Sequence, residues 1–166
     1  MGKDLAESFP AAREVFEAVD EALGVSLSQL MWEGPEDELT LTHNAQPAIL
    51  THSLAAHAVV GEALQPVAGA GHSLGEYSAY VAAGALAPTD AARLVRRRGE
   101  LMLEAGQQRP GTMAAVIGLE SEQVAALCGE ASDAAEVAVA ANLNAPDQSV
   151  ISGDPGAVER AGARLK

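Results

Sequence analysis

Aromatic residues and cysteine are both scarce in this chain of 166 residues. Phe, Tyr and Trp together make up 3% of the sequence, so a core must be built mainly from Ala, Val and Leu. Cys128 is the only cysteine, which excludes an internal disulfide and indicates a reducing compartment. Its apolar helical context is typical of a small buried hydrophobic side chain. Cys and His at metal-ligand spacing are also lacking, so we expect no metal site.

Basic residues are few, with 10 Lys and Arg against 23 Asp and Glu and a formal net charge of −13. Nucleic acids and anionic membranes are bound by clustered cations, so this balance argues against both as partners. No apolar run approaches the length of a membrane span, and no basic-then-apolar leader opens the chain. We therefore expect a cytoplasmic protein. An anionic substrate would need a local basic site.

What the sequence does contain is a globular balance of 48% hydrophobic and 20% charged residues. This length suits one domain with a real core. Before residue 108 the periodicity predicts helices and a single strand. The helices are expected at 4–23 (restarting at Pro10), 46–64, 74–85 and 89–105, and the strand at 67–71.

After residue 108 the pattern changes to short strands that alternate with helices. Strands are expected at 112–118, 136–142 and 148–152, and helices at 121–130 and 155–165, with a turn-rich connector at 142–147. This β-α-β-β-α order resembles a ferredoxin-like unit cut off before its final strand. We therefore predict an α/β protein with a main part at 1–108 and a small subdomain at 109–166.

Two predicted helices carry a polar residue on their apolar stripe. Gln46 lies one turn before Leu50, where it either bonds a nearby loop or lines a site. Arg98 falls in the middle of the next stripe, where it must either extend outward to solvent or bind an anion. That stripe consists of Ala91, Leu94, Leu101, Met102 and Ala105.

The stretch 67–79 combines a short apolar run, the motif Gly71-x-Ser73-x-Gly75 and a helical pattern. A strand that leads through such a turn into a helix is typical of a nucleophile elbow. The serine has a strained backbone there, and the glycines let strand and helix approach closely. The N–H of Leu74 would lie at a helix N-terminus and would favour a developing oxyanion. This arrangement suits acyl transfer, although small residues also cluster in many non-catalytic turns.

The longer string from Gly71 to Ala79 closely resembles the nucleophile motif of malonyl-CoA:acyl-carrier-protein transacylases. The resemblance extends along the chain. It includes Gln46-Pro47-Ala48, Arg98-Gly99-x-x-Met102, Asn142-x-Asn144-x-Pro146 and Gln148-x-Val150-x-x-Gly153. It implies an α/β-hydrolase-like acyltransferase core, here partial, with an incomplete ferredoxin-like subdomain.

The resemblance also implies roles for individual residues. Ser73 would be acylated, with the Leu74 N–H as an oxyanion donor, and Arg98 would bind the malonyl carboxylate. The remaining candidates for substrate binding are Gln46, Met102, His72 and Asn144. The implied reaction moves a malonyl group from malonyl-CoA to acyl carrier protein, in fatty acid or polyketide biosynthesis, with no bound cofactor.

The sequence departs from the family pattern at both ends. The family's first strand and G-Q-G loop would precede Met1, and its catalytic histidine would follow Lys166. None of the four histidines here is a convincing general base, so we expect a central fragment that is weakly active or inactive alone. Two alternatives remain: an α/β-hydrolase-type serine esterase, which needs a histidine after the serine, and a non-catalytic or split acyltransferase module.

Overall fold

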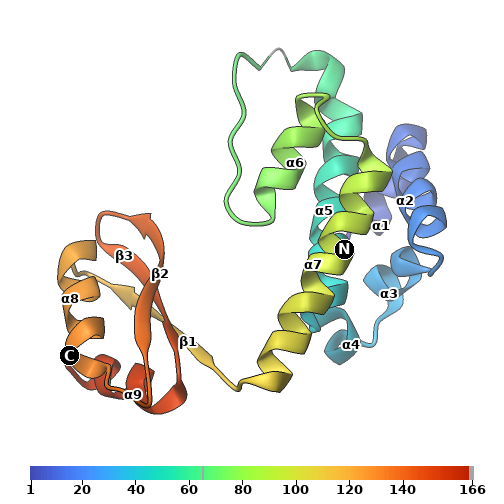
Figure 1. Cartoon of the computed structure of the whole chain (residues 1–166). Helices are drawn as coiled ribbons and strands as arrows, with labels where there is room; N and C mark the ends of the chain where they lie inside the picture. Colours follow the sequence, from blue (N-terminus) through green and yellow to red (C-terminus); the bar gives the residue numbers. More distant parts are fainter. Residues whose placement is uncertain (65, 165–166) are drawn as a thin grey trace. The chain divides into compact units, whose positions relative to one another are not determined.

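The computed structural model describes residues 1–64 and 66–164 and shows an α/β chain. The chain divides into two compact units, Met1–Glu104 and Ala105–Lys166. The first unit is helical, whereas the second contains a sheet with two helices (Figure 1). Within the described residues, no helix has both the length and the apolar character needed to cross a membrane.

The first unit contains all the helices predicted before residue 108. The helix expected at 4–23 does restart at Pro10, and α5 begins at Thr42 rather than at Gln46. Pro47 was expected to open that helix, but it lies inside α5, where it offers no N–H to the carbonyl of His43. The elements are α1 (Lys3–Ser8), α2 (Pro10–Leu23), α3 (Leu27–Glu33), α4 (Glu36–Thr40), α5 (Thr42–Val60), the 3-10 turn η1 (Gly61–Ala63), α6 (Gly75–Ala82) and α7 (Pro88–Gln108, which crosses the unit boundary).

The core of the first unit forms where α2 packs on α5. Phe16 of α2 is fully buried, as its predicted stripe requires, and its ring meets that of Trp32 edge to face at 5.4 Å between centroids. Leu50 and Leu54 of α5 join the same cluster. Burying each of these large apolar side chains contributes about 1.5–3 kcal/mol. This core holds α5 in place beneath the site described below.

The stripe predicted for α7 is wrong in its larger members. Leu94 and Met102 are each about half exposed, and the buried residues are small: Ala91, Ala92, Val95 and Gly99. Small side chains at i, i+3 and i+4 spacing allow a helix to lie close to its neighbour. The helix is therefore rotated about its own axis relative to the predicted orientation. As a result, Arg98 lies at the margin of the buried face.

The strand predicted at 67–71 is absent: residues 66–71 form an irregular, largely exposed segment. Val67 is fully exposed. A β-strand exists only by hydrogen bonding to a neighbouring strand, and β1, β2 and β3 of the described residues pair only with one another. The segment is apolar, as predicted, but none of the described strands pairs with it.

The second unit matches the predicted element order. It comprises β1 (Thr112–Ile117), α8 (Ser121–Ala131), β2 (Ala138–Ala145), β3 (Gln148–Gly153) and α9 (Pro155–Arg164). The sheet is antiparallel with the strand order β1-β3-β2, and Ala115 pairs with Val150. One buried cluster joins Val124 and Cys128 of α8, Val158 of α9 and Ile151 of β3, so both helices cover the same face. As predicted, the Cys128 side chain is a buried hydrophobic one, and burial raises the pKa of its thiol.

The turn-rich connector expected at 142–147 is shorter than predicted. β2 continues to Ala145, with register shifts between Ala140 and Asn142 and between Leu143 and Ala145. β-bulges such as these keep a strand paired through residues with poor strand propensity. Asn144, one of the predicted site residues, therefore lies on a strand, where it is exposed.

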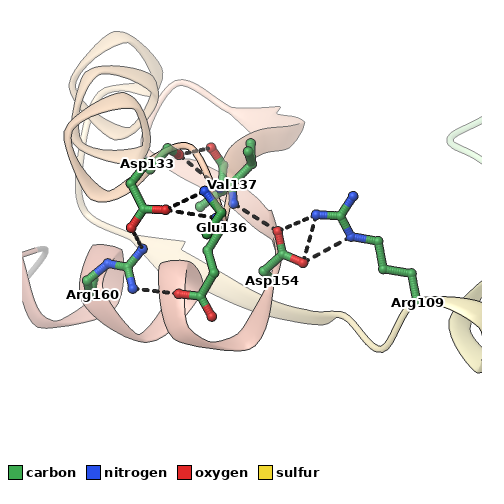
Figure 2. Close-up of polar contacts among 9 residues, drawn as sticks. Arg109, Asp133, Glu136, Val137, Asp154 and Arg160 are labelled. Carbon is green, nitrogen blue, oxygen red and sulfur yellow. Dashed lines mark hydrogen bonds and ion pairs between the residues drawn. The ribbon is translucent and has the colours of Figure 1, made fainter.

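Two carboxylates organise the ends of the second unit's strands (Figure 2). Asp133 accepts hydrogen bonds from the N–H groups of Ala135 and Glu136 at 2.8 and 2.9 Å, and these bonds lower its pKa. Asp154 is bound through both oxygens by Arg109, at distances down to 2.7 Å, and also accepts the N–H of Val137. The arginine, followed by that N–H, lowers the pKa of Asp154.

Candidate active site

Ser73 stands at the apex of the turn that leads into α6. Its φ of 54° lies in the left-handed region, and it is the only non-glycine residue with positive φ in residues 1–64 and 66–164. Such a conformation costs a non-glycine residue roughly 1–3 kcal/mol and is concentrated at functional sites. The residue is exposed. The strained apex predicted from the motif is therefore present, although the strand before it is not.

Gly71 is required because the turn folds back on itself. A Cβ added at Gly71 would lie 2.0 Å from both the carbonyl carbon and the carbonyl oxygen of Gly75. No side chain fits at that distance, and backbone atoms cannot move away as a flexible side chain would. Steric crowding by the Gly75 backbone thus explains why the first position of Gly71-x-Ser73-x-Gly75 is a glycine. A Cβ at Gly75, by contrast, would have no neighbour within 4 Å.

α6 begins at Gly75, two residues after Ser73. The N–H groups of Gly75, Glu76 and Tyr77 donate to the carbonyl oxygens three residues earlier, at 2.9, 3.3 and 3.1 Å. The Leu74 N–H precedes this series, at the position that caps the helix. N–H groups in the first turn of a helix favour nearby negative charge. The Leu74 N–H thus lies at the N-terminus of α6, next to the serine; its role as an oxyanion donor stays a prediction.

Arg98 of α7 reaches the serine across 25 residues of sequence. Its Nη2 donates a hydrogen bond to Ser73 Oγ at 2.9 Å, and its Nη1 donates to Gln46 Oε1. The side chain is half-buried, so it neither extends freely into solvent nor lacks partners. Arg98 was expected either to extend to solvent or to bind an anion, and Gln46 either to bond a loop or to line a site. In the structure the two side chains contact each other, and Arg98 also contacts Ser73.

The Gln46 amide is held on its other side too. Its Nε2 donates to Thr42 Oγ1 at 2.8 Å and to Met102 Sδ at 3.2 Å. Gln46 is 7% exposed, and a buried amide requires such partners. Ser73, Arg98, Gln46 and Met102, predicted separately, therefore lie in one connected group. Thr42 was not predicted, because the helix was expected to begin only at Gln46 and α5 begins at Thr42.

The other arginines of α7 are engaged elsewhere. Arg96 bonds Glu100 at 3.0 Å and Asn44 Oδ1 at 2.7 Å, and Arg97 bonds Glu100 and Glu104. The bond from Arg96, followed by that from Arg97, lowers the pKa of Glu100. Exposed pairs of this type contribute roughly 0–1 kcal/mol each. Their charges are largely neutralised locally, which leaves Arg98 as the arginine of α7 that the structure directs to the serine.

The remaining predicted residues lie in different places. His72 is exposed and adjoins Ser73 in the turn, and its carbonyl accepts the N–H of Gly75. Asn144 belongs to β2 of the second unit. His57, one of the four histidines rejected as a general base, lies beside Gly61, where an added Cβ would come within 3.2 Å of the imidazole ring. In the described ranges, no cluster of His, Cys, Asp and Glu has the arrangement needed to hold a metal ion.

The turn is flanked by two shallow pockets that the sequence did not predict. One of about 320 Å³ is lined by residues of the irregular segment and one side of α6, including Gly71, Glu76 and Tyr80. A second of about 350 Å³ lies between His57, Val67 and Ala82. Both are bordered by the segment that was expected to be a strand. The apolar surface there is consequently open in this structure.

Comparison with known proteins identifies similar chains in bacteria. The chain is 47% identical over 167 residues to a malonyl CoA-acyl carrier protein transacylase of Bacillus subtilis (strain 168), covering 100% of this chain and 53% of that protein. It is 46% identical to the Escherichia coli (strain K12) protein of the same name, covering 98% and 53%. The chain thus spans about half the length of these curated relatives.

Solved structures agree with the sequence comparison. An acyl carrier protein S-malonyltransferase from Vibrio cholerae superposes with a TM-score of 0.91 at 42% identity, covering 99% of this chain and 54% of that one. A malonyl-transacylase in complex with its type II PKS acyl-carrier protein gives the same TM-score, identity and coverage. The family described as the acyl transferase domain matches residues 1–166. This chain therefore belongs to the acyl transferase domain family.

Proposed function

We propose that the complete protein transfers a malonyl group from malonyl-CoA to the phosphopantetheine thiol of acyl carrier protein, in fatty acid or polyketide biosynthesis. The observation that carries this proposal is the hydrogen bond from Arg98 to Ser73. It places a permanent cation beside a strained, exposed serine hydroxyl. A malonyl thioester carries its own carboxylate a few bonds from the carbonyl that the serine attacks. The two groups of the site therefore match the two reactive features of that substrate.

In the proposed reaction, Ser73 Oγ attacks the thioester carbonyl and its proton is taken by a general base. The carbon–sulfur bond breaks, and coenzyme A leaves as a thiol after it gains a proton. The phosphopantetheine thiol then attacks the acyl-serine ester, and Ser73 regains its proton. The Leu74 N–H stabilises the oxyanion of both tetrahedral intermediates. No bound cofactor takes part, because each step is a nucleophilic acyl substitution.

Arg98 selects the acyl group in this proposal. A guanidinium binds a carboxylate through two parallel N–H···O bonds, an arrangement that a neutral acetyl group cannot form. Gln46 holds one side of the guanidinium, and the Nη2 that now bonds Ser73 is the group positioned to meet the incoming carboxylate. Met102 borders the same space through its contact with Gln46. We assign His72 and Asn144 to substrate binding only by resemblance to the family.

The finer description of the fold belongs to the same proposal. We propose that residues 1–108 form part of an α/β-hydrolase-like acyltransferase core and that residues 109–166 form most of a ferredoxin-like subdomain. The strand order β1-β3-β2, with both helices on one face, supports the second assignment. A fourth strand would pair with the free edge of β1. The single cysteine supports a cytoplasmic location.

The test is covalent labelling of the chain by malonyl-CoA, measured by intact mass. We expect one malonyl group on the parent chain, at a slow rate, and none on Ser73→Ala. Acetyl-CoA should label the parent more slowly than malonyl-CoA, and Arg98→Ala should remove that preference. Equal labelling of the parent and Ser73→Ala would contradict the role of Ser73. The esterase alternative gives Arg98 no role, so a parent that prefers acetyl esters would favour it.

A further inference from the structure

We propose that Thr42 is a positioning residue of this site, because its hydroxyl anchors the Gln46 amide and thereby holds the amide oxygen against Arg98. The inference rests on the function proposed above and concerns how that site recognises a carboxylate. The contact on which it depends is the hydrogen bond from Gln46 Nε2 to Thr42 Oγ1 at 2.8 Å.

The orientation of the amide follows from the chemistry of its neighbours. A guanidinium has only N–H donors, so it must meet the oxygen of Gln46 and not the nitrogen. The hydroxyl of Thr42 accepts from Nε2, and Met102 Sδ accepts from the same nitrogen at 3.2 Å. If the amide turned over, two donors would face each other at Arg98. Arg98 therefore selects the orientation of the amide, and the threonine hydroxyl anchors the amide nitrogen in that orientation.

Thr42 is suited to this task by its position and its shape. It is the first residue of α5, four residues before Gln46, so both side chains project from the same face of the helix. A β-branched side chain has few rotamers, which places the hydroxyl reliably. Glutamine has three rotatable side-chain bonds, so holding it in one position costs conformational entropy. The hydrogen bond to Thr42 helps to offset that cost.

The backbone of Thr42 is positioned by α7 itself. A Cβ at Gly99 would lie 2.7 Å from the Thr42 carbonyl oxygen and 2.5 Å from His43 Cα, so the two helices touch at this point. Gly99 directly follows Arg98. The contact therefore fixes the start of α5 relative to the residue that Gln46 must hold. Thr42, Gln46 and Arg98 form one chain of contacts that ends at Ser73 Oγ.

The experiment compares Thr42→Val, which keeps the shape and removes the hydroxyl, with Thr42→Ser, which keeps the hydroxyl. The matched control is Thr51→Val, because Thr51 lies on the same helix and its hydroxyl bonds the carbonyl of Pro47 at 2.7 Å instead. The measured quantity is the ratio of Ser73 labelling rates with malonyl-CoA and acetyl-CoA. Loss of one hydrogen bond should lower this ratio roughly three- to tenfold in Thr42→Val. Thr42→Ser and Thr51→Val should keep the parent ratio.

The outcomes separate this inference from the function on which it rests. If Arg98→Ala removes the malonyl preference but Thr42→Val keeps it, the positioning role is wrong and the proposed function stands. If the parent shows no malonyl preference, the proposed function fails. The side-chain amide signals of Gln46 in a ¹⁵N–¹H spectrum test directly whether Thr42 holds the Gln46 amide. They should move or broaden in Thr42→Val and stay in place in Thr51→Val, and unchanged signals in Thr42→Val would overturn the inference.

Discussion

Gly99 of α7 lies directly against the backbone of Thr42 in α5, where an added Cβ would come within 2.7 Å of the Thr42 carbonyl oxygen. This contact explains why the buried face of α7 is made of small residues. Two helices that approach so closely cannot accommodate a larger side chain between them. The same approach brings Arg98 to Gln46. The geometry of the site therefore depends directly on how α5 and α7 pack in the first unit.

Substituting Gly99 should thus cost stability despite the better helix propensity of alanine. We expect Gly99→Ala to lower the free energy of unfolding of the first unit by about 1–3 kcal/mol, because the new methyl group meets backbone atoms. The fluorescence of Trp32, the only tryptophan, reports this unit in a urea titration. Gly106→Ala in the same helix is the control, since its Cβ would have no neighbour within 4 Å. Equal midpoints for both variants would contradict the prediction.

The close backbone contact in the turn around Ser73 leads to a similar prediction, here about activity. Gly71→Ala would place a methyl group 2.0 Å from the Gly75 backbone, so the turn must open and Ser73 must move away from Arg98. We expect malonyl labelling of Ser73 to fall at least about 100-fold, as misplacement by about 1 Å can do. Gly69→Ala, where a Cβ meets nothing within 4 Å, should label at the parent rate. Intact mass measures both, and normal labelling of Gly71→Ala would refute the steric argument.

Replacing Arg98 by lysine tests the planar arrangement of the guanidinium N–H donors and not the positive charge. Lysine keeps the cation but cannot bond Gln46 and a carboxylate through fixed parallel donors. Loss of a charge-assisted hydrogen bond costs about 1.5–3 kcal/mol. The malonyl-to-acetyl labelling ratio of Arg98→Lys should therefore fall about 10- to 100-fold. Arg93→Lys, at an exposed ion pair with Asp90 on the same helix, should leave the ratio unchanged. A fall of similar size in both variants would show that the loss is not specific to the Arg98 guanidinium.

The ion pair between Arg109 and Asp154 predicts a pH effect in the second unit. The folded-state pKa of Asp154 is lowered, first by Arg109 and then by the Val137 N–H. Its contribution to stability is therefore present above the unfolded pKa of about 3.9 and is lost as the pH falls through the folded value. Arg109→Gln should raise the pKa of Asp154 and shift acid unfolding of this unit to higher pH.

A ¹³C NMR titration of the Asp154 carboxyl measures that change directly. Arg164→Gln is the matched control, because Arg164 forms an exposed pair with Glu130 in the same unit. The control should leave the Asp154 titration where it is. An Asp154 pKa that does not change in Arg109→Gln would show that the backbone N–H of Val137 alone accounts for the shift.

The Cys128 thiol offers a simple probe of the second unit. It is 1% exposed, and burial raises its pKa. Only the thiolate reacts with a disulfide reagent, so reaction at pH 8 requires the unit to open. We expect the native rate to be on the order of 100-fold or more below the rate in urea. Because it is the sole cysteine, absorbance of the released thiolate reports this one site, and rapid reaction in native buffer would contradict the buried packing.

Local structure was predicted well wherever neighbouring residues determine it. The long helices of both units, the element order of the second unit and the buried stripe of α2 follow from periodicity and from Pro10, because hydrogen bonds within a helix depend only on nearby residues. The short helices α3 and α4 were not predicted. Two expectations failed for one shared reason. The strand at 67–71 and the buried face of α7 each depend on the element that pairs or packs against them, and neighbouring residues do not determine that element.

The sequence by itself determined which groups take part in the site: a serine between glycines, an arginine and a glutamine, each on its own element. Only the tertiary structure decided that these groups meet. It brings the Arg98 guanidinium to both Gln46 and Ser73, and it adds Thr42, which no motif indicated. The physical reason is that the close contact of α5 with α7 at Gly99 joins residues far apart in the sequence, and residue spacing within one helix does not show which helix packs against it.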